Sequence, residues 1–159
     1  TSTASSRHRA ASVSPSFITP RSASLSAVSG RACTNGCIAS GKFDEANWNL
    51  FARLGLTPSY LRESGRGMAA VQQNIAYKRE LLAGDIVEVT SRLLEIRDKS
   101  VRFLHEMRNA ETGEVAATCE FVGVHLDRKA RKSAPFAPAI RNAALRHLDP
   151  VEPELVEAT

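Results

Sequence analysis

Apolar residues recur at two different spacings along this chain, and the change of spacing separates a helical region from a region of strands. Between residues 43 and 54 they fall every three or four positions, which predicts one amphipathic helix. The positions are Phe43, Ala46, Leu50, Phe51 and Leu54. Gly55 is expected to end this helix, and Thr57-Pro58 to begin a short second helix that runs to residue 63.

Strands are predicted after residue 67, at 68–79, 85–97, 101–108 and 115–126. The third shows the clearest alternation, because one of its faces is apolar except for a histidine. That face consists of Val101, Phe103, His105 and Met107. Short links between the strands predict an antiparallel meander. Pro138 then opens a last helix, expected to run to residue 148.

Charge divides the chain at the same place as the first helix begins. Residues 1–42 hold eleven serines, five basic residues and no acidic residue, whereas the remainder holds 16 basic and 17 acidic residues. The net charge of +4 therefore does not indicate a nucleic-acid-binding face on the domain. We expect a folded domain at 43–148 and an acidic tail at 149–159. Residues 1–42 are a disordered tail, an organelle transit peptide or a non-native segment.

Cysteines and hydropathy exclude several classes of protein. Three cysteines are too few for a disulfide framework, and Cys33 and Cys37 are not spaced like a pair of zinc ligands. Cys119 falls within a strand and is interpreted as a small buried thiol. No apolar run approaches the roughly 20 residues that a membrane span needs. We therefore expect no metal site, no cofactor and no contact with a membrane.

Several strings, in their order and spacing, resemble the acyl-CoA thioesterases related to 4-hydroxybenzoyl-CoA thioesterase. Phe43-Asp-Glu-Ala-Asn-Trp-Asn-Leu-Phe resembles the central helix of that family, and Tyr77-Lys-Arg-Glu-Leu-Leu-Ala-Gly-Asp resembles a link between its strands. Residues 109–124 look like its last hairpin, and Arg131-Lys132-Ser133, followed by two prolines, is similar to the exit from its final strand. The resemblance covers about residues 43–145.

The resemblance implies an α+β protein with the hotdog fold, in which a long antiparallel sheet wraps around a central helix and a C-terminal helix follows. It also implies that water hydrolyses an acyl-CoA thioester to free acid and CoA without a cofactor. Such a protein is expected to be a cytoplasmic homodimer or homotetramer, or an organelle protein if residues 1–42 are a transit peptide. A non-catalytic domain that binds acyl-CoA or only assembles is the alternative. A hotdog dehydratase is less favoured, because no histidine occurs between His8 and His105.

The family's catalytic aspartate precedes the central helix, and this chain departs from that pattern. Counted back from Phe43 without gaps, its position falls on Ser29, and only Asn35 matches the residues that accompany it. Both the resemblance and the acid-free composition break near residue 43. A frameshift or a misassigned start explains this break, and a divergent inactive member is the other explanation. Turnover is therefore expected to be weak or absent.

Asp44 and Glu45 are the nearest acidic residues to the missing position. They stand at the start of the predicted helix 43–54, where backbone N–H groups are expected to hold the developing oxyanion. The favoured interpretation is that both carboxylates stabilise the helix dipole by about 0.3–1 kcal/mol each. Substitution for the catalytic carboxylate is the other interpretation.

Candidate substrate-binding residues lie in two places. The basic cluster after the last long strand is either a solvated loop or a contact for the phosphates of CoA. It consists of Arg128, Lys129, Arg131 and Lys132, with Lys78 as a weaker addition. Trp48 lies off the apolar stripe, so plain packing, a dimer contact, an acyl pocket and a contact with a quaternary ammonium group all remain open. His105 and His125 are interpreted as core or interface histidines, and the acyl group is not named by the sequence.

Overall fold

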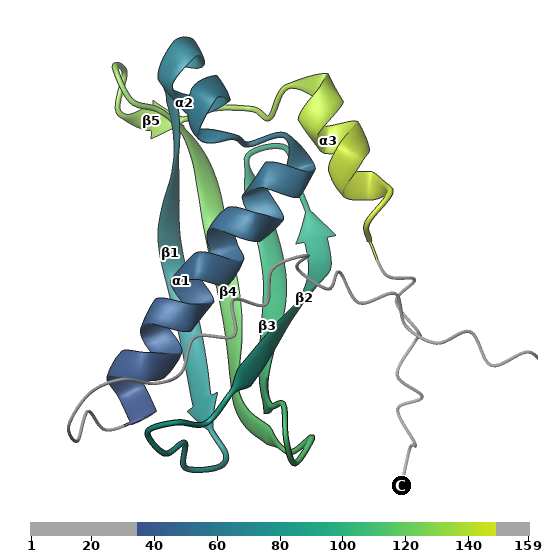
Figure 1. The fold of residues 1–159 in the computed structure, drawn as a ribbon. Helices are drawn as coiled ribbons and strands as arrows, with labels where there is room; N and C mark the ends of the chain where they lie inside the picture. Colours follow the sequence, from purple (N-terminus) through teal and green to yellow (C-terminus); the bar gives the residue numbers. More distant parts are fainter. Residues whose placement is uncertain (1–34, 149–159) are drawn as a thin grey trace, which may run out of the picture.

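The structure, a computed structural model, describes residues 35–148 (Figure 1). Two helices, five successive strands and a last helix make it an α+β protein, which confirms the predicted class. In chain order they are α1 (Asn35–Leu54), α2 (Pro58–Ser64), β1 (Arg66–Tyr77), β2 (Val87–Ile96), β3 (Ser100–Asn109), β4 (Val115–Asp127), β5 (Lys132–Ser133) and α3 (Pro138–Leu145). The strands form one antiparallel sheet in the order β1-β4-β3-β2, with β5 paired to the end of β4.

The predicted meander is correct for β2, β3 and β4 and wrong for β1. β1 pairs with β4 along its whole length, from Arg66 opposite Asp127 to Tyr77 opposite Ala117. The link of residues 78–86 therefore crosses to the far edge of the sheet before β2 begins. Leu81, only 6% exposed, anchors this link in the core. The nine residues of the link are enough for this crossing. The apolar pattern of each strand predicts the strand but does not predict which strand lies beside it.

α1 begins at Asn35, eight residues before the predicted start of the helix. Ala39 is 1% exposed and lies one helical turn before Phe43, so the apolar stripe continues backwards through it. Gly36 and Gly41 fall in the added turns, and glycine is the weakest helix former after proline. Packing on the sheet outweighs that low propensity. Residues 35–42 are therefore not part of a separate tail, and residues 1–34 and 149–159 lie outside the described part of the chain.

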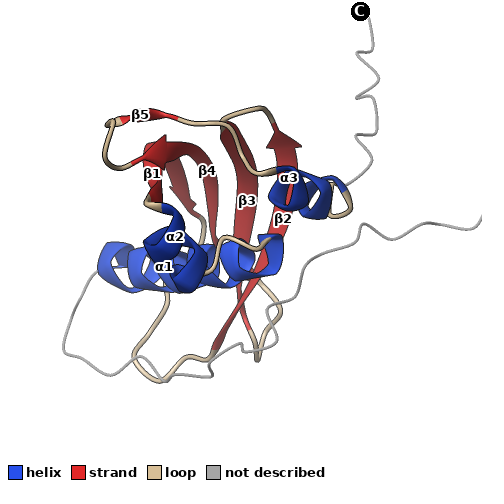
Figure 2. Cartoon of the chain, turned by 90° about the horizontal axis from the view of Figure 1, so that it is seen from above, coloured by secondary structure: helices blue, strands red, loops and turns tan. Residues whose placement is uncertain are grey.

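The sheet curves around α1, which lies across one of its faces (Figure 2). This inner face buries the predicted apolar side of β3, because Val101, Phe103 and Met107 are at most 2% exposed. The opposite, outer face carries the charged residues of the same strands. The interpretation of alternating residues as inner and outer faces is thus confirmed.

Apart from the start of α1, the ends of the helices follow the predicted signals, except at the end of α3. Gly55 ends α1 with a φ of 90°, and the Thr57 hydroxyl accepts a hydrogen bond from the backbone N–H of Tyr60 at 3.2 Å, which caps α2. α3 ends at Leu145 rather than at residue 148. Leu148 instead forms an isolated bridge to Leu93 on the edge of β2.

Candidate functional site

A cleft of about 480 Å³ lies between α1 and β1, and we call it the inner cleft. Its lining residues come from α1, from β1 between Met68 and Gln73, and from one position of β4. They are Ser40, Gly41, Asp44, Asn47, Trp48, Phe51, Met68, Ala69, Ala70, Gln73 and Phe121. The cleft therefore combines an apolar wall with a small number of polar groups, as ligand sites commonly do.

The position of α1 on the sheet explains why this cleft is open. The helix packs against β2, β3 and α3, on the side of the sheet away from β1. Figures 1 and 2 show β1 at the far edge of the curved sheet. Most side chains of β1 are exposed, including Val71, which is 60% exposed. The inner cleft is the space that α1 leaves uncovered.

Asp44 is the single carboxylate among the described residues that line the cleft. Its side chain is exposed, and no salt bridge joins it to any residue between 35 and 148. Glu45, its neighbour, instead forms an exposed ion pair with Lys42 at 3.1 Å and does not line the cleft. The structure thus separates the two acidic candidates.

The predicted location of both carboxylates at a helix N-terminus is wrong. α1 has no acidic residue in its first turn, because it begins at Asn35 and Asp44 lies in its interior. Neither residue complements the helix dipole. The backbone N–H groups near Phe43 are also occupied within the helix, since only the first four N–H groups of an α-helix lack an internal partner. The predicted oxyanion site at residue 43 therefore does not exist.

A buried hydrogen-bond chain reaches the inner cleft from the sheet. Asn47 Oδ1 lies 2.8 Å from His105 Nε2, and His105 Nδ1 lies 2.7 Å from Ser91 Oγ. All three residues are buried, with exposed fractions of 7% for Asn47, 0% for His105 and 3% for Ser91. Ser91 and His105 are direct partners in the β2–β3 register. Asn47 is the member of the chain that lines the cleft.

The donors and acceptors in this chain follow from the charge of His105. Burial lowers the pKa of His105 from 6.5 to about 4, because removal from water disfavours the imidazolium. The ring is therefore neutral at pH 7, with one donor and one acceptor nitrogen. An amide oxygen can only accept, so Nε2–H donates to Asn47 and Nδ1 accepts from the Ser91 hydroxyl. His105 is a satisfied core histidine, as predicted.

His125 is also fully buried, but it does not reach the inner cleft. Its Nδ1 lies 2.9 Å from the carbonyl oxygen of Ala134, and its ring stacks on Phe136 at 4.8 Å. Its Nε2 has no hydrogen-bond partner within residues 35–148. The prediction of a core histidine is confirmed. Cys119 is buried as predicted, and burial raises the pKa of its thiol.

Trp48 projects into the inner cleft with 49% of its surface exposed. Its ring makes an edge contact with Phe51 at a centroid distance of 6.2 Å. About half of this side chain is packed against the described residues, and the rest is open to the inner cleft. Asp44 and Trp48 are four residues apart on α1, so their side chains are neighbours on one helix face.

The basic cluster forms the exposed turn between β4 and β5, beside the first residues of β1. Asp127 fixes this turn by accepting hydrogen bonds from the backbone N–H groups of Lys129 and Ala130. A Cβ on Gly67 would lie 3.2 Å from the side chain of Arg128. Gly67 precedes Met68, which lines the cleft. The turn thus lies close to one end of the inner cleft, whereas Lys78 follows the opposite end of β1.

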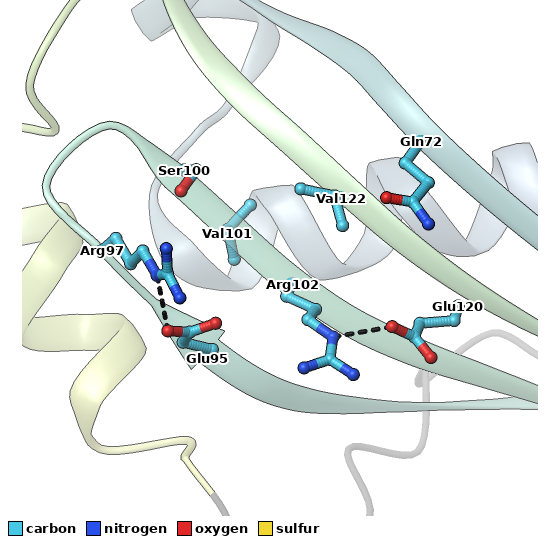
Figure 3. A pocket seen from close by; sticks show the side chains of 8 residues that line it. All are labelled: Gln72, Glu95, Arg97, Ser100, Val101, Arg102, Glu120 and Val122. Carbon is cyan, nitrogen blue, oxygen red and sulfur yellow. Dashed lines mark hydrogen bonds and ion pairs between the residues drawn. The ribbon is translucent and has the colours of Figure 1, made fainter.

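A second hollow, of about 290 Å³, lies on the outer face of the sheet, and we call it the outer groove. Figure 3 shows its lining residues, with α1 behind the strands. They are Gln72, Glu95, Arg97, Ser100, Val101, Arg102, Glu120 and Val122. Its charges are paired with each other, Arg97 with Glu95 at 2.6 Å and Arg102 with Glu120 at 2.7 Å.

Sequence reasoning missed Asn47 and its link to the sheet. A signal was present, because Asn47 lies four residues after Phe43 and three before Leu50, within the apolar stripe of the helix. Ser91 likewise interrupts the apolar face of β2. Ser29 and Cys33 lie outside the described residues, as do the side chains of Asn35 and Cys37.

The described residues contain no group of three or more side chains placed to hold a metal ion. None of their helices is both long and apolar enough to cross a membrane.

Comparison with known proteins assigns the family. The model of the thioesterase-like superfamily matches residues 38–144. The chain belongs to this superfamily. A curated L-carnitine dehydrogenase/betainyl-CoA thioesterase from Agrobacterium fabrum is 36% identical over 103 residues, and its counterpart from Rhizobium meliloti is 32% identical over 104. Each match covers 65% of this chain and 21% of the relative, so the chain spans about a fifth of the length of these relatives.

Solved structures confirm the predicted hotdog fold of this thioesterase-like chain. A Staphylococcus aureus protein solved in complex with CoA has a TM-score of 0.74 at 14% identity, with coverage of 94% of this chain and 98% of that one. A gentisyl-coenzyme A thioesterase has a TM-score of 0.58 at 25% identity, with coverage of 68% and 84%.

Proposed function

We propose that the protein hydrolyses an acyl-CoA thioester to free acid and CoA in the inner cleft, with Asp44 as the catalytic carboxylate. The observation that carries the proposal is the position of Asp44, a carboxylate that lines the inner cleft and has no ion-pair partner among the described residues. Membership of the thioesterase-like superfamily supports the reaction.

The proposed step requires no cofactor. Asp44 accepts a proton from water while the water oxygen bonds to the thioester carbonyl carbon. The carbon–sulfur bond then breaks, and the proton passes to the departing sulfur of CoA. Glu45 is the weaker candidate, because its carboxylate is paired with Lys42 and does not line the cleft.

We propose a short acyl group that carries a quaternary ammonium. The curated relatives are named for betainyl-CoA, whose ammonium nitrogen is separated from the thioester carbonyl by a single methylene. Trp48 offers an exposed aromatic face, which attracts such cations. Because Trp48 and Asp44 lie one helical turn apart on α1, roughly 5–6 Å between Cβ atoms, they suit a cation and a carbonyl this close together.

The remainder of CoA is proposed to leave the cleft toward the basic turn. Arg128, Lys129, Arg131 and Lys132 are exposed there, and Arg and Lys side chains bind phosphate groups. The contact of this turn with Gly67 places it at the end of β1 that leads into the cleft. Lys78 lies at the other end of β1 and is not part of this proposal.

We propose that a second copy of the chain pairs with the edge of β1. This strand has twelve residues, and none between Gly67 and Tyr77 is charged, so it lacks the usual protection of an exposed edge. Such pairing would also cover Val71 and narrow the inner cleft. Pairing of two β1 edges is compatible with a homodimer and with a homotetramer. Because acyl-CoA is an intracellular metabolite, the proposal places the protein in the cytoplasm.

The test is release of CoA thiol from betainyl-CoA by the purified full chain, by Asp44→Asn and by Glu45→Gln. We expect Asp44→Asn to lower kcat about 10²–10⁴-fold, the usual range for loss of a general base. Glu45→Gln is the matched control and should stay within about twofold, since its exposed pair contributes little. Equal rates for wild type and Asp44→Asn would contradict the assignment. Binding of acyl-CoA without hydrolysis of any acyl chain would favour the non-catalytic alternative.

A further inference from the structure

Hydrolysis in the inner cleft needs a hydrogen-bond donor for the thioester carbonyl oxygen, where negative charge develops as water attacks. The backbone N–H groups beside Asp44 cannot supply it, because they lie in the interior of α1 and bond within the helix. The donors that remain in the lining of the cleft are side chains, those of Ser40, Asn47, Trp48 and Gln73.

The amide of Asn47 is such a donor, and it is held in one orientation. Its Oδ1 accepts the hydrogen bond from His105 Nε2 at 2.8 Å, so the oxygen points toward the sheet. With the ring proton on Nε2, rotation of the amide by 180° would place N–H against N–H and lose this bond. The Nδ2 group is thereby the part of the amide that remains for the cleft, which Asn47 lines with an exposed fraction of 7%.

His105 is itself fixed. Ser91 Oγ lies 2.7 Å from Nδ1, and its hydroxyl donates to Nδ1 in the tautomer that carries the ring proton on Nε2. The ring lies between Phe43, at a centroid distance of 6.0 Å, and Phe103, at 5.0 Å. Because Ser91 and His105 are directly paired across two strands, the sheet sets the position of the amide on α1.

Asn47 also lies at a useful distance from Asp44. The two residues are three positions apart on α1, so their side chains project from the same helix face with roughly 5–6 Å between Cβ atoms. A carbonyl group placed between them would meet the donor at its oxygen and the activated water at its carbon.

We propose that Asn47 donates a hydrogen bond from Nδ2 to the thioester carbonyl oxygen, and that His105 and Ser91 are positioning residues that orient this amide. This inference rests on the proposed hydrolysis of acyl-CoA in the inner cleft. It gives a role to the buried hydrogen bonds from Ser91 through His105 to Asn47, which take no part in the action of Asp44.

Kinetics provide the first readout. Asn47→Ala is expected to lower kcat roughly 10²–10³-fold with little change in KM, as for loss of other oxyanion donors. Asn47→Asp keeps the shape of the side chain and its contact with His105 but has no N–H, so its kcat should fall at least as far. Asn49→Ala is the matched control, because Asn49 Nδ2 bonds the carbonyl oxygen of Glu45 and does not line the cleft.

Ser91 separates positioning from plain packing. Ser91→Ala removes the hydroxyl that sets the ring proton, and kcat is expected to fall about threefold to tenfold, as for loss of one hydrogen bond. Ser91→Thr keeps a hydroxyl and should recover most of that loss. A loss of the same size in both variants would overturn the role of the hydroxyl.

The second readout does not depend on turnover. Betainyl-CoA with a ¹³C-labelled carbonyl is bound to two proteins, Asp44→Asn and the double variant Asp44→Asn/Asn47→Asp. The infrared stretching frequency of the carbonyl is measured in each complex. A lower frequency in the protein that keeps Asn47 supports the inference, and equal frequencies in the two proteins overturn it.

Failure of the inference and failure of the proposed function give different results. If the wild-type protein hydrolyses betainyl-CoA, and substitution of Asn47 changes neither kcat nor the carbonyl stretch, the inference alone is overturned. A shifted stretch in a protein that never hydrolyses overturns the proposed function alone. No binding of betainyl-CoA overturns both.

Discussion

The inner cleft and the outer groove lie on opposite faces of one sheet. They differ in whether their charged side chains are paired. In the outer groove Arg97 and Arg102 are joined to Glu95 and Glu120 (Figure 3). In the inner cleft Asp44 has no such partner among the described residues, and Trp48 is half exposed. Charges that neutralise one another leave little for a ligand, whereas uncommitted groups are available for binding and chemistry.

The two faces should differ most in their contribution to stability. Phe103 and Arg102 are neighbours on β3, but Phe103 faces α1 at 0% exposed and stacks on Phe121 at 4.8 Å. We expect Phe103→Ala to lower the free energy of unfolding by about 3–5 kcal/mol. Arg102→Ala, on the outer face, should cost less than about 1 kcal/mol, because its pair with Glu120 is exposed. Urea unfolding of both variants checks this, and similar losses would contradict the assignment of the faces.

Acid should destabilise the inner face through His105. The pKa of His105 is about 4 in the folded chain and about 6.5 when unfolded, so the unfolded state binds the extra proton first as pH falls. Stability is therefore full above pH 6.5 and is lost progressively down to pH 4, by about 3 kcal/mol in total. His105→Gln removes this titration. Unfolding free energies at pH 7 and pH 5 should converge in the variant, and an unchanged pH dependence would contradict the prediction.

A smaller effect is expected at Trp48, on the open side of the inner cleft. Trp48→Leu removes the aromatic face but keeps apolar bulk, so KM for betainyl-CoA should rise about tenfold, within the usual range of a cation–π contact. KM for a neutral acyl-CoA of equal length should change little. Because Trp48 is about half exposed and leucine keeps apolar bulk at its contact with Phe51, thermal unfolding should change little. An equal rise for both substrates would indicate that Trp48 does not recognise the cation.

The same contrast explains how far sequence reasoning reached. Alternation along β3 fixes which side chains face α1, because it is a local property with a period of two. The inner cleft depends on where α1 lies across the sheet and on β1 crossing to its far edge, and neither is local. The start of α1 was missed because Gly36 and Gly41 obscure a stripe that Ala39 continues.

Asp44 shows how a wrong helix boundary changes the role predicted for a residue. At residue 44 of a helix that begins at 43, a carboxylate stabilises the dipole. In a helix that begins at Asn35 the same residue lies in the interior and faces the cleft. The sequence names Asp44 as a candidate, but its environment could only come from the packed structure.

Fluorescence of Trp48 tests the central claim most directly, because it is the one tryptophan of the chain and it lines the inner cleft. A non-hydrolysable thioether analogue of betainyl-CoA would be titrated into the full chain, with binding measured in parallel by calorimetry. We predict a saturable change in tryptophan emission with the same dissociation constant as the calorimetric one. Calorimetric binding with unchanged emission would mean that the ligand binds elsewhere, and would contradict the assignment of the inner cleft as the site.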